Sequence, residues 1–455
     1  MAYNFLPCDR NQGYLLPPSL ADWLPEGHLA WFIIDAVEQI ELESFYQKYR
    51  TDGVGNSAFN PSMMVSLLFY AYCTGERSSR RIEKFCQTDV AYKVITANRG
   101  PDHTTIARFR KDNDQDLKGL FLEVLRLCAE AGLVKLGTVS LDGTKIKANA
   151  SLAANRTLKH LEREVEKMLT EAAARDAEED EAFGVDKRGD ELPEGLRDRN
   201  SRLSRLKACK ERLEREKADA RRVQQEKIDR RQAKEEATGK KTRGRKPKLP
   251  EEGENTEAKA NVTDPDSRIM KTRKGYVQGL NAQAAVTQEQ IIVAEDVTRQ
   301  ANDTQQLHPM LQQVDTNRRA VGVKGSIGVA LADAGYCSDD NFTKVPAGEA
   351  ELLIATQKDW KQRKAMHDQP PPRGRIPSGL SATELMERKL RTRRGRELYK
   401  LRSQTVEPVF GQIKDVRGFD IFMRRGFDAC RCEWSLICCT HNLLKLWRSG
   451  KACWN

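Results

Sequence analysis

Apolar residues recur with helical spacing through the first third of the chain. Asn60-Pro61 places a helix-capping residue directly before a first-turn proline, and an apolar stretch from Met63 to Tyr72 follows. A longer amphipathic segment then runs from Leu117 to Leu133. The pattern therefore predicts an all-α amino-terminal domain over residues 1–134.

Within this domain, short helical segments flank a Gly-Pro break that precedes a helix from Thr104 to Lys111. A helix-turn-helix has this form, and it reads DNA by placing its second helix in the major groove. Arg108 and Arg110 on the last segment are then candidate DNA-binding residues. Helices that pack together without any ligand produce the same pattern, so both interpretations stay open.

From Gly137 the pattern changes to the alternation of apolar and polar residues that is typical of a β-strand. The first strand spans Thr138 to Ala148 and is rich in β-branched residues. After residue 262, strands and helices alternate again, which predicts an α/β domain made of residues 135–151 and 262–447. Its later elements are a strand hairpin at 276–286 and 291–297, a helix at 303–314, strands at 326–333 and 351–356, and a helix at 381–414.

The two parts of this domain are separated by a strongly charged segment, residues 152–261, which we interpret as a helical and flexible insertion. Apolar residues in it step by three and four positions, the spacing of a heptad seam, and predict two helical arms. The stretch from Arg243 to Lys248 resembles an arm that binds the minor groove or backbone of DNA, although a flexible linker has the same composition. The seam residues are Leu158, Leu161, Val165 and Met168 in the first arm and Leu203, Leu206 and Leu213 in the second.

Charge is distributed unevenly along the 455 residues, which carry 77 Lys and Arg against 66 Asp and Glu. Residues 201–250 hold 19 basic and 8 acidic side chains, which accounts for the whole net charge of +11. A second basic tract, residues 361–402, holds 13 basic and 4 acidic side chains. Such tracts bind polyanions by releasing condensed counterions, so they favour a nucleic-acid partner; a solvated surface is the alternative interpretation.

Other features of the sequence exclude several classes of protein. No apolar run reaches the length of a membrane-spanning helix, and the amino terminus lacks the basic and apolar regions of a signal peptide. Eleven cysteines at irregular positions indicate reduced thiols in a cytoplasmic protein. Near the carboxyl terminus, Cys430, Cys432, Cys438, Cys439 and His441 do not follow the spacing of a structural zinc site, so we predict that the cysteines are buried in a helix.

Two carboxylates fall on predicted strands. Asp142 lies within the first strand, and Asp333 ends the strand that begins at Ser326. A carboxylate in such a position is costly to desolvate unless it has a partner, so both residues indicate a ligand or a metal ion.

Three acidic blocks, in this order of elements, resemble those of the DDE transposases of bacterial insertion sequences. The first two blocks are Leu141-Asp142-Gly143-Thr144 and Ala332-Asp333-Ala334-Gly335-Tyr336. The third lies on the late helix and matches the identities of the family's tyrosine, arginine, glutamate and lysine, with four residues rather than three between the arginine and the glutamate. Its residues are Tyr399, Arg402, Glu407 and Lys414.

The resemblance implies a ribonuclease H-like fold, in which a mixed five-stranded sheet has flanking helices, follows the all-α domain and is interrupted by the charged insertion. It implies that Asp142, Asp333 and Glu407 are the catalytic residues. These carboxylates would bind two Mg²⁺ or Mn²⁺ ions, which prefer hard oxygen ligands. Without metal their charges repel, so we expect a raised pKa in at least one of them.

The resemblance also implies the partners. Tyr399, Arg402 and Lys414 would contact double-stranded DNA, both at the terminal inverted repeats of the element and at the target. Two ends imply a homodimer in a synaptic complex, in the cytoplasm and on the nucleoid. Two alternatives remain open at this point, namely a metal-dependent nuclease of the same fold and a DNA-binding regulator without catalysis.

Overall fold

The computed structural model describes residues 19–50, 57–183, 202–239, 247–249, 258–272, 275–343, 350–357, 365, 368–452 and 454. Residues 243–246 of the predicted DNA-binding arm lie outside this set. No described helix is both long and apolar enough to cross a lipid bilayer.

The amino-terminal part is helical, as predicted. Asn60 caps α3 by accepting a hydrogen bond from the Ser62 amide, and Pro61 occupies the first turn. Nearly every residue of α3 is buried, because the other helices surround it. The elements are η1 (Leu20–Trp23), α1 (Leu29–Glu38), α2 (Glu43–Tyr46), α3 (Pro61–Cys73), α4 (Ser79–Thr88), α5 (Val90–Ile95), α6 (His103–Asp112) and α7 (Asp114–Glu130).

The described strands of the α/β part form a six-stranded mixed sheet in the order β4-β5-β1-β7-β8, with β6 also paired to β5. β1 runs parallel to β7 and antiparallel to β5. Because β4 and β6 both pair with the edge of β5 that β1 leaves free, the sheet is five strands wide, as predicted, and β4 is an added short strand. The strands are β1 (Thr138–Lys147), β4 (Arg268–Thr272), β5 (Gly275–Thr287), β6 (Ile292–Thr298), β7 (Val329–Ala332) and β8 (Glu351–Ile354).

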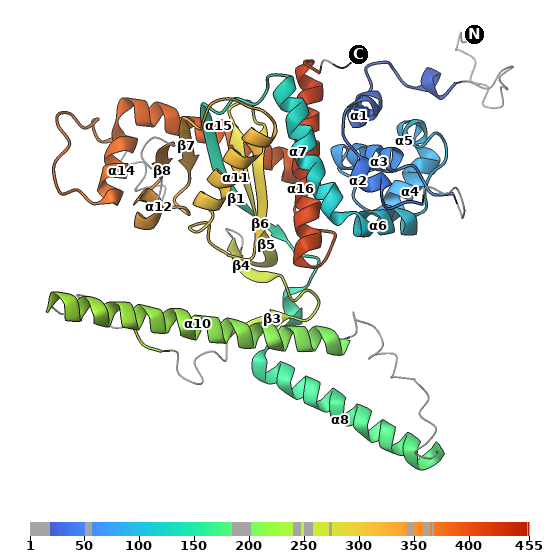
Figure 1. Ribbon diagram of the computed structural model, residues 1–455, viewed down its shortest axis with the longest axis horizontal. Coiled ribbons are helices and arrows are strands. Elements are labelled where there is room, and N and C mark those ends of the chain that lie inside the picture. The colour runs from blue at the N-terminus through green and yellow to red at the C-terminus, as the bar shows by residue number, and fades with distance from the viewer. Residues whose placement is uncertain are drawn as a thin grey trace, which may run out of the picture.

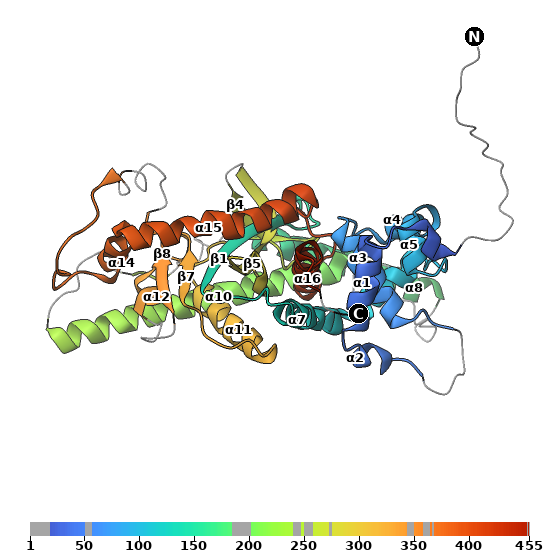
Figure 2. The ribbon, with the colours of Figure 1, turned by 90° about the horizontal axis from the view of Figure 1, so that it is seen from above.

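Helices cover both faces of the sheet (Figures 1 and 2). α15 (Arg393–Gly411) crosses one face, and α11 (Leu307–Ala320) lies on the other. α16 (Phe427–Ser449) runs between the sheet and the amino-terminal helices and packs against β6, α7 and α3. The buried side chains of both parts form one continuous hydrophobic core, so α16 joins the amino-terminal helices to the sheet.

Two predicted helices differ from the observed ones. The helix expected at 303–314 begins later, at Leu307, because Pro309 fits the first turn, where its missing N–H costs nothing. The helix expected at 381–414 is two helices, α14 (Ala382–Arg391) and α15, with α12 (Asp339–Thr343) packed against α14. Thr392 separates them because its backbone is extended and its hydroxyl caps α15 at the Gly395 amide.

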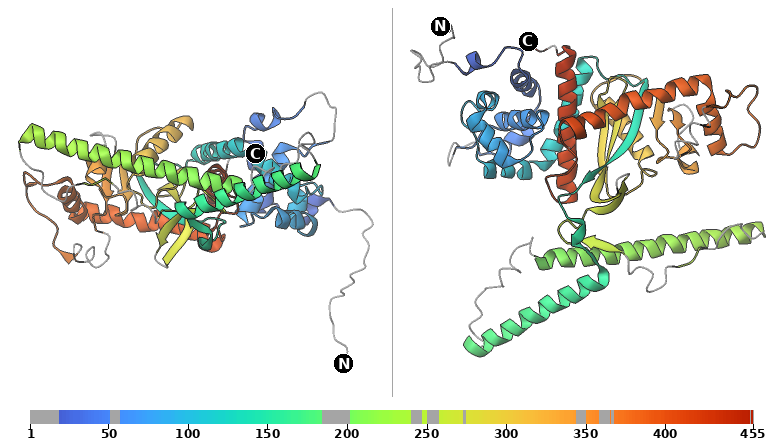
Figure 3. Two further views of the ribbon diagram at one scale, coloured as in Figure 1. Left: turned by 90° about the horizontal axis from the view of Figure 1, so that it is seen from below. Right: turned by 180° about the vertical axis from the view of Figure 1, so that it is seen from behind.

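The charged insertion contains the two predicted arms, α8 (Leu158–Phe183) and α10 (Arg202–Thr238), which lie below the sheet in Figure 1, contact each other near β3 and diverge from there (Figures 1 and 3). A short 3-10 turn, Leu152–Ala154, leads into β2 (Asn155–Thr157), which pairs with β3 (Lys259–Asn261). The predicted seam is confirmed, because it forms a small separate core between the arms. Its buried members are Leu161, Val165, Leu203, Leu206, Cys209, Leu213 and Ala260.

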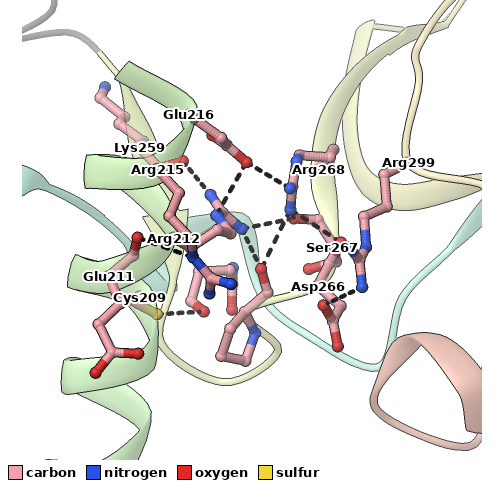
Figure 4. A network of polar contacts seen from close by, with 12 residues as sticks. Cys209, Glu211, Arg212, Arg215, Glu216, Lys259, Asp266, Ser267, Arg268 and Arg299 are labelled. Atoms are coloured by element: carbon pink, nitrogen blue, oxygen red, sulfur yellow. Dashed lines mark hydrogen bonds and ion pairs between the residues drawn. The ribbon is translucent and has the colours of Figure 1, made fainter. Parts of the chain in front are cut away.

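A polar network fixes the base of α10 against the sheet (Figure 4). The Arg212 guanidinium is almost fully buried and donates to the carbonyl oxygens of Lys259, at 2.9 Å, and Pro265. Arg268 on β4 reaches Glu216 of α10 at 2.5 Å. Arg299 pairs with Asp266 at 2.7 Å. These charge-assisted contacts hold the arm at its base, while residues 214–222 of α10 are exposed on all sides.

Candidate active site

Asp142 and Asp333 lie side by side because of the strand register. β1 and β7 are parallel, and Leu141 pairs with Ala332, so the two aspartates are the next residues on neighbouring strands. One carboxylate oxygen of Asp142 accepts a hydrogen bond from the Gly143 amide at 2.9 Å. Asp333 accepts one from the Gly335 amide at 2.7 Å, which orients its side chain just beyond the end of β7.

Arg402 of α15 connects the first and third acids. Its Nη2 lies 2.6 Å from Oδ2 of Asp142, and its Nη1 lies 3.4 Å from Oε1 of Glu407. The Asp142 and Arg402 side chains are 16% and 11% exposed, whereas that of Glu407 is 58% exposed. The structure thus brings Asp142 and Asp333 together and links Glu407 to them through the guanidinium, at the solvent-exposed rim of the site.

The electrostatics of the site follow from this arrangement. Burial raises the pKa of Asp142 to about 7, against the opposing effect of Arg402, and the charge of Asp333 raises it further. A raised pKa in at least one of the three acids is therefore found, as expected, although desolvation is its main cause and the neighbouring carboxylate is a smaller one.

Specific contacts set the position of α15 on the sheet. The buried Thr405 hydroxyl donates to the Ser140 hydroxyl of β1 at 2.6 Å, two residues before Asp142. Further along, Pro408 removes the amide that would bond the Gln404 carbonyl, and the Gln290 side chain donates to that carbonyl at 2.9 Å instead. A π-helical turn, Gln412–Val416, follows. Such turns are frequent at functional sites.

The predicted DNA-binding residues of the third block also make internal contacts. The Tyr399 hydroxyl donates to the Ala332 carbonyl at 3.2 Å, directly before Asp333. Lys414 in the π-helical turn donates to the Thr144 hydroxyl and to the Lys145 carbonyl, both at 3.0 Å. Burial lowers the pKa of Lys414. Both residues therefore connect the third block to the strands that carry the other two.

The arginines of the predicted helix-turn-helix differ in exposure. Arg108 on α6 is exposed. Arg110 is 8% exposed and donates to the Arg77 carbonyl at 2.7 Å and to the Ser79 hydroxyl. Arg110 thus holds α6 against α4 from inside the domain, and Arg108 alone of the two faces the solvent.

Two residues of the site were missed by the sequence interpretation, Asp303 and Lys145. Asp303 lies in the turn before α11 and accepts hydrogen bonds from the Asn281 and Gln283 side chains of β5, both at 2.7 Å. Lys145 of β1 lies 3.8 Å from Asp303, and the carboxylates of Asp303, Asp333 and Asp142 all act to raise its pKa, against a larger lowering by burial. Asn281 and Gln283 were the available signal, because polar residues at alternate positions of an apolar strand need buried partners.

The donor chemistry of the site fits a hard divalent cation. Carboxylate oxygens of Asp142, Asp333 and Glu407 are the ligands that Mg²⁺ and Mn²⁺ prefer. In the described part of the chain, however, no three His, Cys, Asp or Glu side chains lie close enough together to form a preformed metal site. The positive charge beside these acids comes from Arg402, whose guanidinium contacts both Asp142 and Glu407.

The carboxy-terminal cysteines are buried on α16, as predicted. Burial raises the pKa of Cys430, Cys432, Cys438 and Cys439 well above the ordinary thiol value. Both ring nitrogens of His441 are within hydrogen-bond distance of a partner, at 3.0 Å from Gln412 Oε1 and 2.9 Å from the Gln290 carbonyl oxygen. These side chains therefore belong to the core.

Comparison with known proteins gives two matches, both to families of transposases. Residues 18–112 match a transposase domain (DUF772), and residues 237–443 match the transposase DDE domain. The second match includes Asp333 and Glu407 and begins after Asp142. No curated protein matches, and no solved structure matches. The DDE domain has a ribonuclease H-like fold, in agreement with the mixed sheet and its flanking helices, and the chain belongs to the DDE transposases of insertion sequences.

Proposed function

We propose that this protein cuts DNA at the ends of its own mobile element and joins the resulting 3′ ends to target DNA. The observation that carries the proposal is the pairing of Leu141 with Ala332, which sets Asp142 and Asp333 next to each other under the helix that bears Glu407. Phosphodiester cleavage and strand transfer are both displacements at phosphorus, so one set of carboxylates serves both steps.

The three acids would hold two Mg²⁺ or Mn²⁺ ions, which activate the attacking oxygen and stabilise the leaving one when they are bound. Asp142 and Asp333 are oriented for this role by the Gly143 and Gly335 amides. Glu407 is more exposed and lies at the rim, where its carboxylate is accessible to solvent and to a DNA strand.

Basic residues around the acids bind the DNA backbone. Arg402, Lys145 and Lys414 supply positive charge to the phosphates beside the scissile bond, and Arg402 exchanges its carboxylate partners for phosphate when DNA binds. Tyr399 fixes the end of β7 by its hydrogen bond to the Ala332 carbonyl. Arg108 and the basic tract at 361–402 contact the flanking duplex, through phosphates that carry no sequence information.

Action on two element ends requires two subunits, so we propose a homodimer in the synaptic complex, acting in the cytoplasm. The apolar seam between α8 and α10 is buried within one chain. Subunit pairing therefore uses other surfaces than this seam.

A DNA cleavage assay tests the proposal. The purified protein is incubated with Mg²⁺ or Mn²⁺ and a plasmid carrying the DNA that flanks its gene, including any inverted repeats. We expect cleavage at the repeat ends and joining of the 3′ ends to a second DNA. Cleavage without joining identifies a nuclease instead, and the absence of both reactions with intact end binding identifies a DNA-binding regulator.

Substitutions of the acids make the assay specific. Replacing a residue that only hydrogen-bonds to a metal ligand lowers metal affinity or activity about 10- to 100-fold. We therefore expect Asp333→Asn and Glu407→Gln, which change proposed ligands themselves, to lower cleavage by more than about 100-fold while end binding persists. Glu397→Gln is the matched control, since Glu397 lies on the same helix and is 65% exposed. Near-normal cleavage by the Asp333 and Glu407 variants contradicts their role as ligands.

A further inference from the structure

Asp303 is held in the active site by side chains of β5 and β1, and it lies against the glycines of the first two acidic blocks. Its Oδ1 accepts hydrogen bonds from Asn281 and Gln283 and lies 3.8 Å from Lys145. Its side chain is only 14% exposed. A buried carboxylate is costly to desolvate, and the two amide donors and Lys145 hold this one in place.

Two glycines leave room for the Asp303 side chain. A Cβ atom at Gly143, directly after Asp142, would lie 2.4 Å from Asp303 Oδ1. A Cβ atom at Gly335, two residues after Asp333, would lie 2.9 Å from Asp303 Oδ2 and 2.8 Å from Asp333 Oδ1. Both glycines of the first two acidic blocks thus make space for the same carboxylate. The two distances at Gly335 also show that Asp303 Oδ2 is on the side of Asp333.

Asn281 supplies an independent indication of a ligand at this place. Its side chain is fully buried, and its amide nitrogen donates to Asp303 at 2.7 Å and to the Gln300 carbonyl at 3.1 Å. Its Oδ1 has no hydrogen-bond partner among the residues that the structure describes. That oxygen lies 2.9 Å from the position of a Cβ at Gly143, beside the acids. Leaving a buried amide oxygen unpaired is unfavourable, so a bound group that donates to it is favoured.

We infer that Asp303 is a fourth acidic residue of the metal-binding site. Asn281, Gln283 and Lys145 hold Oδ1, and Oδ2 binds, directly or through a water molecule, the divalent ion held by Asp142 and Asp333. Water carried by the bound ion would also supply the donor that the Asn281 oxygen lacks. The inference rests on the proposed function, because it assumes that Asp142 and Asp333 bind metal.

Titration of the full-length protein with Mn²⁺ alone, followed by the electron paramagnetic resonance signal of the free ion, tests this role. Since partners around a metal site are worth about 10- to 100-fold in affinity, we expect Asp303→Asn to weaken Mn²⁺ binding by that factor. Asn281→Ala removes one donor and the unpaired oxygen, and it should weaken binding to a smaller extent. The control is Asp315→Asn, because Asp315 lies on α11 and pairs with Arg318 and Arg319 at the surface.

Thermal unfolding in EDTA separates a metal ligand from a structural residue. A ligand role predicts that Asp303→Asn unfolds at the wild-type temperature or above it without metal, because one of several like charges is gone, and that added Mn²⁺ stabilises it less. A lower unfolding temperature in EDTA together with unchanged Mn²⁺ affinity overturns the inference. Failure of the wild-type protein to bind Mn²⁺ overturns the proposed function as well, whereas equal binding by wild type and Asp303→Asn overturns the inference alone.

Discussion

Arg402 and Asp142 form a nearly buried ion pair, with Nη2 2.6 Å from Oδ2, across 260 positions of sequence. The same guanidinium reaches Glu407 at 3.4 Å. In the proposed function, a metal ion on Asp142 and a phosphate on Arg402 would each compete with this pair. Metal loading and DNA binding would then be coupled through the Arg402 side chain.

Substitution of Arg402 should destabilise the metal-free protein. Removing one partner of a buried ion pair leaves an uncompensated charge, so we expect Arg402→Gln to lower the free energy of unfolding by about 3 kcal/mol in EDTA at pH 8. Mn²⁺ should restore most of this loss, because the metal replaces the missing positive charge. Urea unfolding with and without Mn²⁺ measures both effects. Arg393→Gln, at a 90% exposed position of the same helix, is the control and should change neither. A loss that Mn²⁺ does not repair shows that Arg402 acts chiefly through packing.

Glu295 gives the protein a pH dependence that is separate from the active site. It is 3% exposed on β6, and burial raises its pKa from 4.5 to about 7. Between these values the folded state keeps a proton that the unfolded state releases, so stability falls as the pH rises from 4.5 through 7. Glu295→Gln should remove the contribution of Glu295, leaving that of Asp142, whose pKa is also raised to about 7, and should raise the free energy of unfolding at pH 8 by about 3 kcal/mol, with little gain below pH 4.5.

Urea unfolding of wild type and Glu295→Gln across this pH range measures the difference. Glu130→Gln, at a 58% exposed position on α7, is the control and should leave the pH profile unchanged. Equal pH profiles for wild type and Glu295→Gln contradict the raised pKa.

The base of the α10 arm should depend on Arg212. Arg212→Met leaves the carbonyl groups of Lys259 and Pro265 without their charged donor, so we expect a local loss of about 2 to 4 kcal/mol at β3 and the start of α10. Hydrogen exchange of the amides in this region should become faster, while exchange in α16 stays slow. Arg222→Met is the matched control, because Arg222 is 70% exposed on the same helix. Uniform acceleration over the whole chain argues against a local role.

The basic tract at 361–402 should contribute to the salt dependence of DNA binding. Each phosphate contact that is lost reduces the slope of log affinity against log salt by about 1. Replacing four exposed residues by alanine should therefore flatten the slope in fluorescence anisotropy titrations of a DNA duplex. The test set is Arg373, Arg375, Lys389 and Lys400, and the charge-matched control set is Lys135, Lys271, Arg319 and Lys324. An unchanged slope for the test set removes this tract from the DNA-binding surface.

Periodicity and turn signals were sufficient to predict most elements of the fold. The alternation from Thr138 onward identified β1, and the Asn60-Pro61 cap placed the start of α3. The seam of α8 and α10 was visible as well, because its apolar spacing is local in sequence. Element boundaries were less accurate where a single side chain decides them, as at Thr392 and Pro309.

The sequence by itself predicted the helical amino-terminal part, the strands and helices of the α/β part and the charged insertion, because each rests on residue types at short spacings. The mixed sheet and the three acidic blocks were predicted from the resemblance to DDE transposases. Only the tertiary structure decided that Arg402 lies between Asp142 and Glu407, that Arg110 faces inward, and that Asp303 lies against Asn281 and Lys145. These relationships arise from strand register and from helix placement on the sheet. They join residues far apart in the chain, and no local pattern records them.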